Sequence, residues 1–462
     1  MNQSSQFSLR NYFLANQNIP WPAIMLSIVA AETSTLTLVS IPGLAYDTNL
    51  GFLQLVFGYI IARLVISLIF LPQYFRGRMF TAYELIQYRF GKQLRVFTAI
   101  LFLLTRAAAE GVRILAIAIV LGVTLGSNDI ISLAIVVLIT LGYTMVRGMP
   151  VVIWTDVAQV GIYLTGALVA FFTLCQQTPG GWSEIYTAAQ AAHKLQIFDF
   201  SRNFFITYTF WSGLLGGLFL TLASHGTDQL IVQRLLSAKN LRSAQIALIA
   251  SGFIILLQFT LFLIIGVMLW NFYRDFPPAA AFVRADKIFP IYIAKHLANG
   301  PFILLVMAIV AAAMANLSAA LNSLASSSVM DIYLLARPQA SEKERLRIAR
   351  FATIFWGLVL FTLAIFSRHG GRVLEMGLAI ASVTYGSMLG VFLLGTLTQR
   401  ANQHGALLGM LSGLVLNIYL WRYTHVPYTW YVLLGSITTG TLGYLASRAL
   451  GPDEVLARSA ES

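Results

Sequence analysis

Long runs of uncharged, apolar residues constrain this chain more than any other feature of its sequence. Several of these runs exceed the roughly 20 residues that a helix needs to cross a bilayer. Backbone groups inside lipid must hydrogen-bond within their own segment, so the runs predict helices. Only 10% of the 462 residues are charged, whereas soluble domains carry roughly a quarter. We therefore predict an all-α polytopic membrane protein with no separate soluble domain.

The apolar runs divide into twelve candidate spans. Their approximate bounds are 21–46, 50–72, 97–125, 128–146, 150–175, 204–223, 243–271, 300–333, 349–367, 372–397, 404–421 and 427–449. With the N-terminus inside, the cytoplasmic loops and tails hold twice as many lysines and arginines as the outer loops. This bias predicts that both termini are cytoplasmic, and it attributes the net charge of +12 to topology instead of a nucleic-acid partner.

The remaining composition argues against other protein classes. A single cysteine, Cys175, permits neither a disulfide framework nor a cysteine metal site. The six histidines are scattered, and we find no phosphate loop or nucleophile elbow, so we expect no enzyme. Residues 1–20 show no cleavable signal. We expect a multi-pass protein of the cell inner membrane.

Two spans carry interruptions. The first contains the polar patch 30–35 followed by Pro42 and Gly43, and the sixth carries Gly213, Gly216 and Gly217. If spans one to five and six to ten are inverted repeats, the two interruptions correspond. Paired broken helices at a repeat interface are where transporters bind substrate and ions. Glycine in a membrane helix is also often a packing device, so the glycines leave both interpretations open.

Six ionisable residues lie inside predicted spans, and their formal charges sum to zero: Glu32, Arg63, Arg106, Glu110, Arg113 and Asp156. Each costs a few kcal/mol in the bilayer unless it is paired or hydrated. The spacing of Arg106, Glu110 and Arg113 places them on one helix face. They predict either an internal ion-pair ladder or an Arg106 that is partly free to bind a substrate carboxylate. We expect Glu32 and Arg63 to form a structural pair.

Two further polar features admit a functional and a structural interpretation. Asp156, next to Thr155, is a hard-oxygen ligand suited to a small cation, or else it caps the start of a helix. The eighth span carries a cluster of oxygen-bearing side chains, Asn316, Ser318, Asn322 and Ser323. That cluster is a candidate for the transport pathway, although small polar residues also serve as interhelical contacts.

Several stretches resemble the sodium:solute symporter family, which includes sodium/glucose and sialic-acid cotransporters. They include 12–46, 58–91, IWTDVAQ (153–159), HGTDQLIVQRLLSAKN (225–240) and LNSLASSSVMDIY (321–333), and they occur in the expected order. The resemblance implies a five-plus-five inverted-repeat core of the leucine-transporter type. The implied divisions are a cytoplasmic segment 1–20, a first repeat 21–176, a second repeat 204–397, two peripheral helices 404–449 and a cytoplasmic tail 450–462. Family members usually carry one more helix before the first stretch.

The resemblance also implies Na+ as the coupling ion, at a site that departs from the family pattern. One sodium would be bound by carbonyls of Ala30 and Thr33 and by the eighth span. There the contributions map to the carbonyl of Ala312 and to two hydroxyl positions, which are Ala315 and Asn316 here. A second sodium site maps to Asp156 and Ser318.

The substrate prediction rests on a few positions. Arg106 lies where sialic-acid-type members present an arginine to a carboxylate, which favours an organic anion or amino acid. We expect Thr35, Thr37 and Gln54 to line the same cavity. Ser224 is a further candidate, because sugar-carrying members have aromatic gate residues there. His225 is either a polar gate or a helix-end residue, and we favour the helix-end interpretation.

The sequence thus predicts a sodium-coupled symporter for a small polar organic solute, working by alternating access. Two alternatives remain at this point. One is proton-coupled or uncoupled transport on the same fold, with Glu32 or Asp156 carrying the proton. The other is a membrane solute sensor that does not transport. The expected partners are a small-molecule solute and the lipid bilayer.

Overall fold

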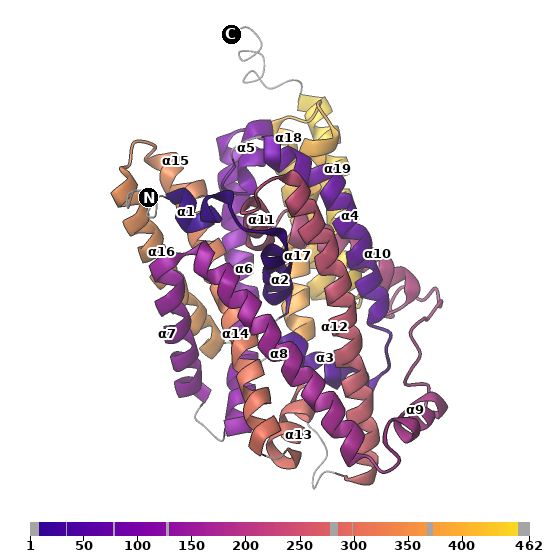
Figure 1. Cartoon of the computed structure of the whole chain (residues 1–462). Coiled ribbons are helices and arrows are strands. Elements are labelled where there is room, and N and C mark those ends of the chain that lie inside the picture. The colour runs from indigo at the N-terminus through magenta and orange to yellow at the C-terminus, as the bar shows by residue number, and fades with distance from the viewer. Residues whose placement is uncertain are drawn as a thin grey trace.

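The computed structural model describes residues 9–33, 35–76, 79–125, 129–277, 285–297, 299–366 and 373–450. Every regular element in these ranges is a helix, and the long ones stand side by side in one bundle (Figure 1). The α-helices are α1 (Leu9–Leu14), α2 (Trp21–Glu32), α3 (Thr35–Asp47), α4 (Leu53–Arg76), α5 (Tyr83–Phe90), α6 (Lys92–Leu125), α7 (Asp129–Arg147), α8 (Met149–Gln177), α9 (Gly181–Ala191), α10 (Phe210–Gly226), α11 (Gln229–Leu236), α12 (Leu241–Asp275), α13 (Ile288–His296), α14 (Asn299–Ser327), α15 (Leu334–Ala336), α16 (Glu342–Phe366), α17 (Val373–Leu397), α18 (Gln403–Tyr423) and α19 (Tyr431–Leu450). A π-helical turn, η4 (Ser328–Tyr333), joins α14 to α15, and short 3-10 turns occupy η2 (Ala15–Gln17), η3 (Ala285–Lys287) and η6 (Tyr428–Trp430).

Seven helices of the described ranges are long and apolar enough to cross a membrane, by length and composition alone. They are α4, α8, α12, the run through α14 to α15, α16, α17 and α18. Helices α6, α7 and α19 and the broken pairs α2/α3 and α10/α11 account for the other predicted spans. The predicted all-helical polytopic fold is confirmed.

The first span is broken where the sequence predicts. Helix α2 ends at Glu32, and the next residue, Thr33, is extended with ψ of 94° before α3 begins at Thr35. The last four carbonyls of a helix lack partners within it. A break at this depth therefore exposes polar backbone in the interior of the bundle, where lipid does not reach.

The second break is not where the glycines predict it, so that prediction is wrong. Helix α10 runs without interruption past Gly213 and Gly217 and ends at Gly226, and the break falls at Thr227–Asp228 before α11. The glycines instead allow α10 and α4 to pack closely. A Cβ on Gly217 would overlap the carbonyl oxygen of Leu55, and one on Gly213 would lie 2.8 Å from the Cβ of Gln54. The packing interpretation of these glycines is therefore correct.

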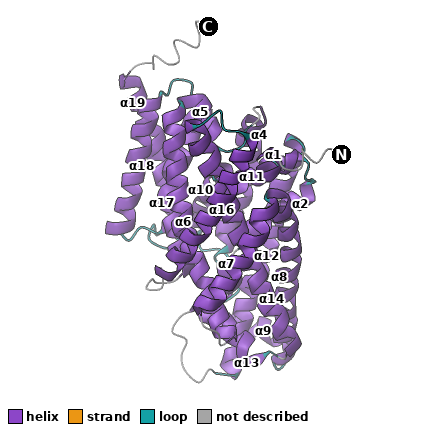
Figure 2. Ribbon diagram, turned by 90° about the vertical axis from the view of Figure 1, so that its left-hand side faces the viewer, coloured by secondary structure: helices purple, strands orange, loops and turns teal. Residues whose placement is uncertain are grey.

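The arrangement in space brings the two broken pairs together near the centre of the bundle. Helix α12 packs against α2, α3 and α4, and α10 packs against α4. Helices α18 and α19 lie at one edge and contact the rest mainly through α17 (Figure 2). Helices α1 and α5 and the end of α19 lie at one end of the bundle, and α9 and α13 lie at the other (Figure 1).

Candidate functional site

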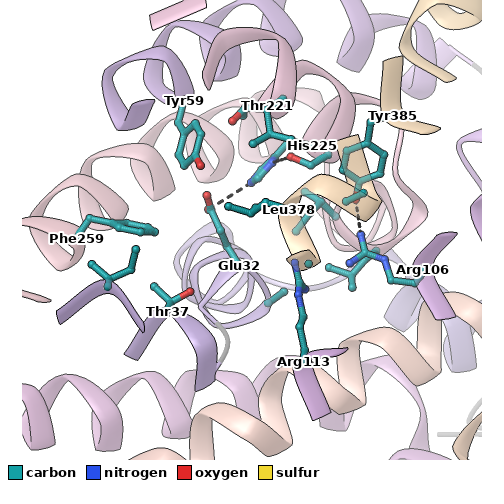
Figure 3. Close-up of a pocket in the computed structure, with 18 of the residues that line it drawn as sticks. Glu32, Thr37, Tyr59, Arg106, Arg113, Thr221, His225, Phe259, Leu378 and Tyr385 are labelled. Carbon is teal, nitrogen blue, oxygen red and sulfur yellow. Dashed lines mark hydrogen bonds and ion pairs between the residues drawn. The ribbon is translucent and has the colours of Figure 1, made fainter. Parts of the chain in front are cut away.

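A cavity of about 100 Å³ lies between the two helix breaks. At roughly 10–15 Å³ for each water, it has room for several water molecules. Figure 3 shows Glu32, His225, Arg106 and Arg113 pointing toward the same space. The described lining includes Ala31, Glu32, Thr37, Ile41, Phe52, Tyr59, Arg106, Arg113, Leu220, Thr221, Ser224, His225, Phe259, Leu378, Ala381 and Tyr385.

Glu32 forms one charged corner of this cavity. Its carboxylate pairs with Arg63 of α4, as the sequence predicts. His225, at the end of α10, lies with Nε2 3.3 Å from Glu32 Oε2 and 3.1 Å from the Arg63 guanidinium. The Arg63 guanidinium can only donate to Nε2 and the Glu32 carboxylate can only accept from it, so the tautomer decides which contact is a hydrogen bond; Nδ1 lies 2.9 Å from Ser224 Oγ. His225 lies in the last turn of α10, as predicted, and its side chain also lines the cavity.

Arg106 is held by partners on three elements. Its Nη1 donates to Glu110 at 3.0 Å, and its Nη2 contacts Asp228 and donates to Tyr385 Oη at 2.7 Å. Tyr385 also donates to Asp228 at 2.5 Å. Only Nε lacks a partner among the described residues. The carboxylates of Glu110 and Asp228 are both fully buried. Both terminal nitrogens of the Arg106 guanidinium are therefore already used by buried partners.

Glu110 completes the predicted ladder. It accepts from Arg113 Nη1 at 2.9 Å as well as from Arg106, and Asn316 Nδ2 donates to its other oxygen at 2.5 Å. Asn316 Oδ1 in turn accepts from Arg113 at 3.3 Å. The described bonds of Arg113 all use Nη1, and its side chain keeps 19% of its surface exposed. Arg113 therefore has donors available on the cavity side.

The charges around the cavity balance. With His225 neutral, Arg63, Arg106 and Arg113 offset the three carboxylates that they contact, Glu32, Glu110 and Asp228. Buried charges are tolerated when they are paired and hydrogen-bonded. Adding one anion alone would leave a net charge in this site, whereas an anion together with a cation would not.

Asp156 lies away from the cavity lining, between α8, α2 and α11. One carboxylate oxygen accepts from Ser27 Oγ at 2.5 Å and from Arg234 at 3.0 Å. The other oxygen, Oδ1, is buried and has no hydrogen-bond partner among the described residues. Arg234 also donates to Ser27 Oγ at 2.9 Å. The sequence interpretation did not include this arginine.

Every predicted sodium ligand that the structure describes lies in the interior of the bundle. Ala30, Thr33, Ala312 and Ser318 are fully buried. Thr33 Oγ1 accepts from Gln258 at 2.7 Å, and Ser318 Oγ donates to the carbonyl of Ala315 at 3.0 Å. These positions remain a prediction for sodium binding.

The predicted substrate contacts divide into two groups. Thr37, Ser224 and Arg106 line the cavity. The side chain of Thr35 lies outside the described part of the structure. Gln54 bonds to backbone instead: its amide nitrogen donates to the carbonyls of Gly51 and Tyr208, and its oxygen accepts from Asp199 N–H at 3.0 Å. Gln54 thus holds the segment before α10 and is not among the described lining residues.

Sequence reasoning missed Asp228 and Tyr385 as site residues. Asp228 stands just beyond the predicted end of the sixth span, and Tyr385 lies in a span where nothing distinguishes a site tyrosine from a packing one. The extended backbone of Asp228, which caps α11 through a 2.8 Å bond to the N–H of Leu230, fixes it beside Arg106. The Asp-Gln pair after a helix end is the local signal that could have identified it.

Comparisons with known proteins agree with this architecture. The model of the sodium:solute symporter family matches residues 12–413. A sodium-coupled monocarboxylate transporter 2 from Mus musculus is 26% identical over 89% of this chain and 67% of its own length. A sodium/sialic acid symporter from Aliivibrio fischeri is 26% identical over 96% of this chain and 88% of its own. The chain spans about two thirds of the mammalian relatives, 64% for a sodium-dependent multivitamin transporter from Oryctolagus cuniculus.

Solved structures give the same result. The substrate-bound outward-open state of a Na+-coupled sialic acid symporter matches with a TM-score of 0.90 and 25% identity, covering 97% of this chain and 94% of that one. A nucleobase-cation-symport-1 transporter shares the fold, with a TM-score of 0.61 at 12% identity. Both matches extend over nearly the whole chain, and the relatives are transporters, not enzymes. The chain belongs to the sodium:solute symporter family.

Proposed function

We propose that this protein carries out sodium-coupled symport of a small organic anion by alternating access. The observation that supports the proposal most is the balanced charge of the cavity, which Arg113 lines with donors that no described residue uses. A carboxylate that binds there without a cation would bring an uncompensated charge into the bundle. Binding together with Na+ at the first helix break, next to the lining residues Ala31 and Glu32, keeps the site neutral, which couples the two solutes.

Arg113 makes the direct contact with the substrate carboxylate in this proposal. Its Nη2 and Nε have no hydrogen bond to a described residue, and together they form the planar fork that matches a carboxylate. Arg106 is a positioning residue, because three partners already use both of its terminal nitrogens. The cavity volume of about 100 Å³ favours a compact monocarboxylate. Thr37 and Ser224 would supply further hydrogen bonds from the lining.

Sodium binds, in the same proposal, at two regions. The carbonyls of Ala30, Thr33 and Ala312 would contribute near the first helix break. Asp156 with Ser318 supplies the second region, and its buried Oδ1 still lacks a partner among the described residues. Because that oxygen is available, we expect Asp156 to bind sodium more strongly than Asn316 does. The amide of Asn316 already bonds to Glu110 and Arg113.

The proposed setting is the inner membrane with both termini in the cytoplasm, as the distribution of basic residues indicates. The two five-helix repeats would be 21–176 and 204–397, with 404–449 as peripheral helices. Each half contributes one broken helix, α2/α3 and α10/α11. Rocking of these halves would expose the cavity to each side in turn.

Binding is tested by thermal stability of the purified protein in sodium or potassium at matched ionic strength, with and without lactate. A ligand that binds the folded state raises its stability in proportion to RT ln(1 + [L]/Kd). We expect a sodium-specific shift that grows with sodium concentration and that Asp156→Asn reduces, and a sodium-dependent lactate shift that Arg113→Gln abolishes. Asp275→Asn, an exposed carboxylate at the end of α12, is the control. Equal shifts in sodium and potassium would contradict the coupling.

A further inference from the structure

A second concave surface lies on the outside of the bundle, and its described lining shares no residue with that of the charged cavity. It is a groove between α10, α17 and α19 that encloses about 790 Å³, within the roughly 300–1,000 Å³ of ligand pockets. Its walls are mostly apolar and include Phe219, Leu397, Ile437 and Tyr444. Ile437 and Leu397 keep 51% and 64% of their surface exposed, so the groove opens toward the bilayer.

The groove exists because a glycine forms part of its wall. A Cβ built on Gly440 would meet no atom within 4 Å. By contrast, a Cβ on Gly443, less than one turn later in α19, would lie 3.0 Å from Leu394. The missing side chain at Gly440 therefore leaves space that neighbouring helices do not fill. Water does not fill such apolar space within a membrane, so lipid chains are its natural occupants.

Basic side chains gather at one end of the groove. Arg400 lines it and is exposed. Arg89 of α5 reaches the same end, because its Nη2 donates to the carbonyl of Thr398 at 3.0 Å. Arg448 follows Tyr444 by four residues on α19, which places it on the same helix face. None of the described lining residues is acidic. This end of the groove lies on the side of the bundle where α5 and the end of α19 are found (Figure 1).

From these features we infer that the groove binds an anionic phospholipid, with an acyl chain along Gly440 and the phosphate at Arg400 and Arg89. Basic pockets between membrane helices on the cytoplasmic side recognise acidic headgroups in this way. Binding requires both the apolar wall and the basic end of the groove. A zwitterionic lipid lacks the net negative charge and free phosphate lacks the acyl chain, so neither should bind as well as an anionic phospholipid. The inference does not rest on the proposed transport function.

The test measures the thermal stability of the purified protein against added phosphatidylglycerol, phosphatidylcholine or inorganic phosphate. We expect a shift that grows with the concentration of phosphatidylglycerol and that the other two additives do not produce. Arg400→Gln should weaken the apparent affinity about fivefold, the change that corresponds to about 1 kcal/mol for each basic residue near the lipid surface. Gly440→Leu places its Cβ in open space and its side chain in the groove, and it should abolish the shift.

Two control variants separate the groove from general effects of charge and hydrophobicity. Arg347→Gln removes an exposed arginine on α16, and Gly161→Leu adds a side chain at another open position, on α8. Both should retain the full phosphatidylglycerol shift. An equal shift with phosphatidylcholine or phosphate, or an unchanged shift in Gly440→Leu, would overturn the inference. So would a dimer that Gly440→Leu dissociates, because a second copy would then be the occupant.

Discussion

Replacing Glu110 by glutamine tests whether the buried charge network holds the core together. Glu110 is fully buried and bonds to Arg106 at 3.0 Å, to Arg113 at 2.9 Å and to Asn316 at 2.5 Å. Glu110→Gln removes the charge that these two guanidinium groups share and leaves the network with one excess positive charge. Removing one partner of a buried pair costs about 3–5 kcal/mol. We expect the free energy of unfolding to fall by about that amount.

The assay is thermal or denaturant unfolding in detergent, with Glu344→Gln as the matched control. Glu344 lies 3.9 Å from Arg337, and both side chains are exposed, so solvent screens that pair and its loss should matter little. The double variant Glu110→Gln/Arg113→Gln restores neutrality. The double variant should lose less free energy of unfolding than the two single variants lose in sum, by about 0.5–3 kcal/mol. Equal stability of Glu110→Gln and Glu344→Gln would refute the reasoning.

Three further predictions follow from other parts of the bundle. Gly217→Ala should destabilise the protein by about 1–3 kcal/mol in unfolding assays, because the added methyl group overlaps Leu55, whereas Gly440→Ala should be neutral. Burial raises the pKa of Glu84 in α5 to about 7, so the folded protein holds this proton more tightly than the unfolded chain does. The free energy of unfolding should therefore fall as the pH rises from about 4.5 to 7. Glu84→Gln should remove that part of the pH dependence, and identical pH profiles of the two proteins would contradict it. Tyr385→Phe should weaken lactate binding by loosening Arg106 without abolishing the sodium shift, as judged by titration.

The fold and some charge pairs were predictable because their signals are local. Apolar run length predicts the spans. The spacing of Arg106, Glu110 and Arg113 predicts a ladder that the structure contains. The Glu32–Arg63 pair follows from two charges at similar depth on consecutive spans. In each case the partners are on the same helix or on neighbouring segments of the chain.

The other half of the site depends on contacts between distant segments. Arg106 meets Asp228 and Tyr385 across 122 and 279 residues, and Asp156 meets Arg234 across 78. A single sequence carries no signal for such pairing. The glycines of α10 are ambiguous for a related reason: a glycine permits either a break or a close approach, and only the position of Leu55 decides which. Gln54 is likewise polar at a span end, but its partners are backbone groups of another segment.

Uptake of radiolabelled lactate into proteoliposomes tests the central claim most directly. An inward sodium gradient should drive accumulation above equilibrium, and a potassium gradient of the same size should not. Arg113→Gln and Asp156→Asn should each abolish accumulation, whereas Asp275→Asn should retain it. Uptake that is equally fast in sodium and potassium, or that follows a proton gradient with no sodium present, would contradict the proposal that the neutral cavity couples an anion to Na+.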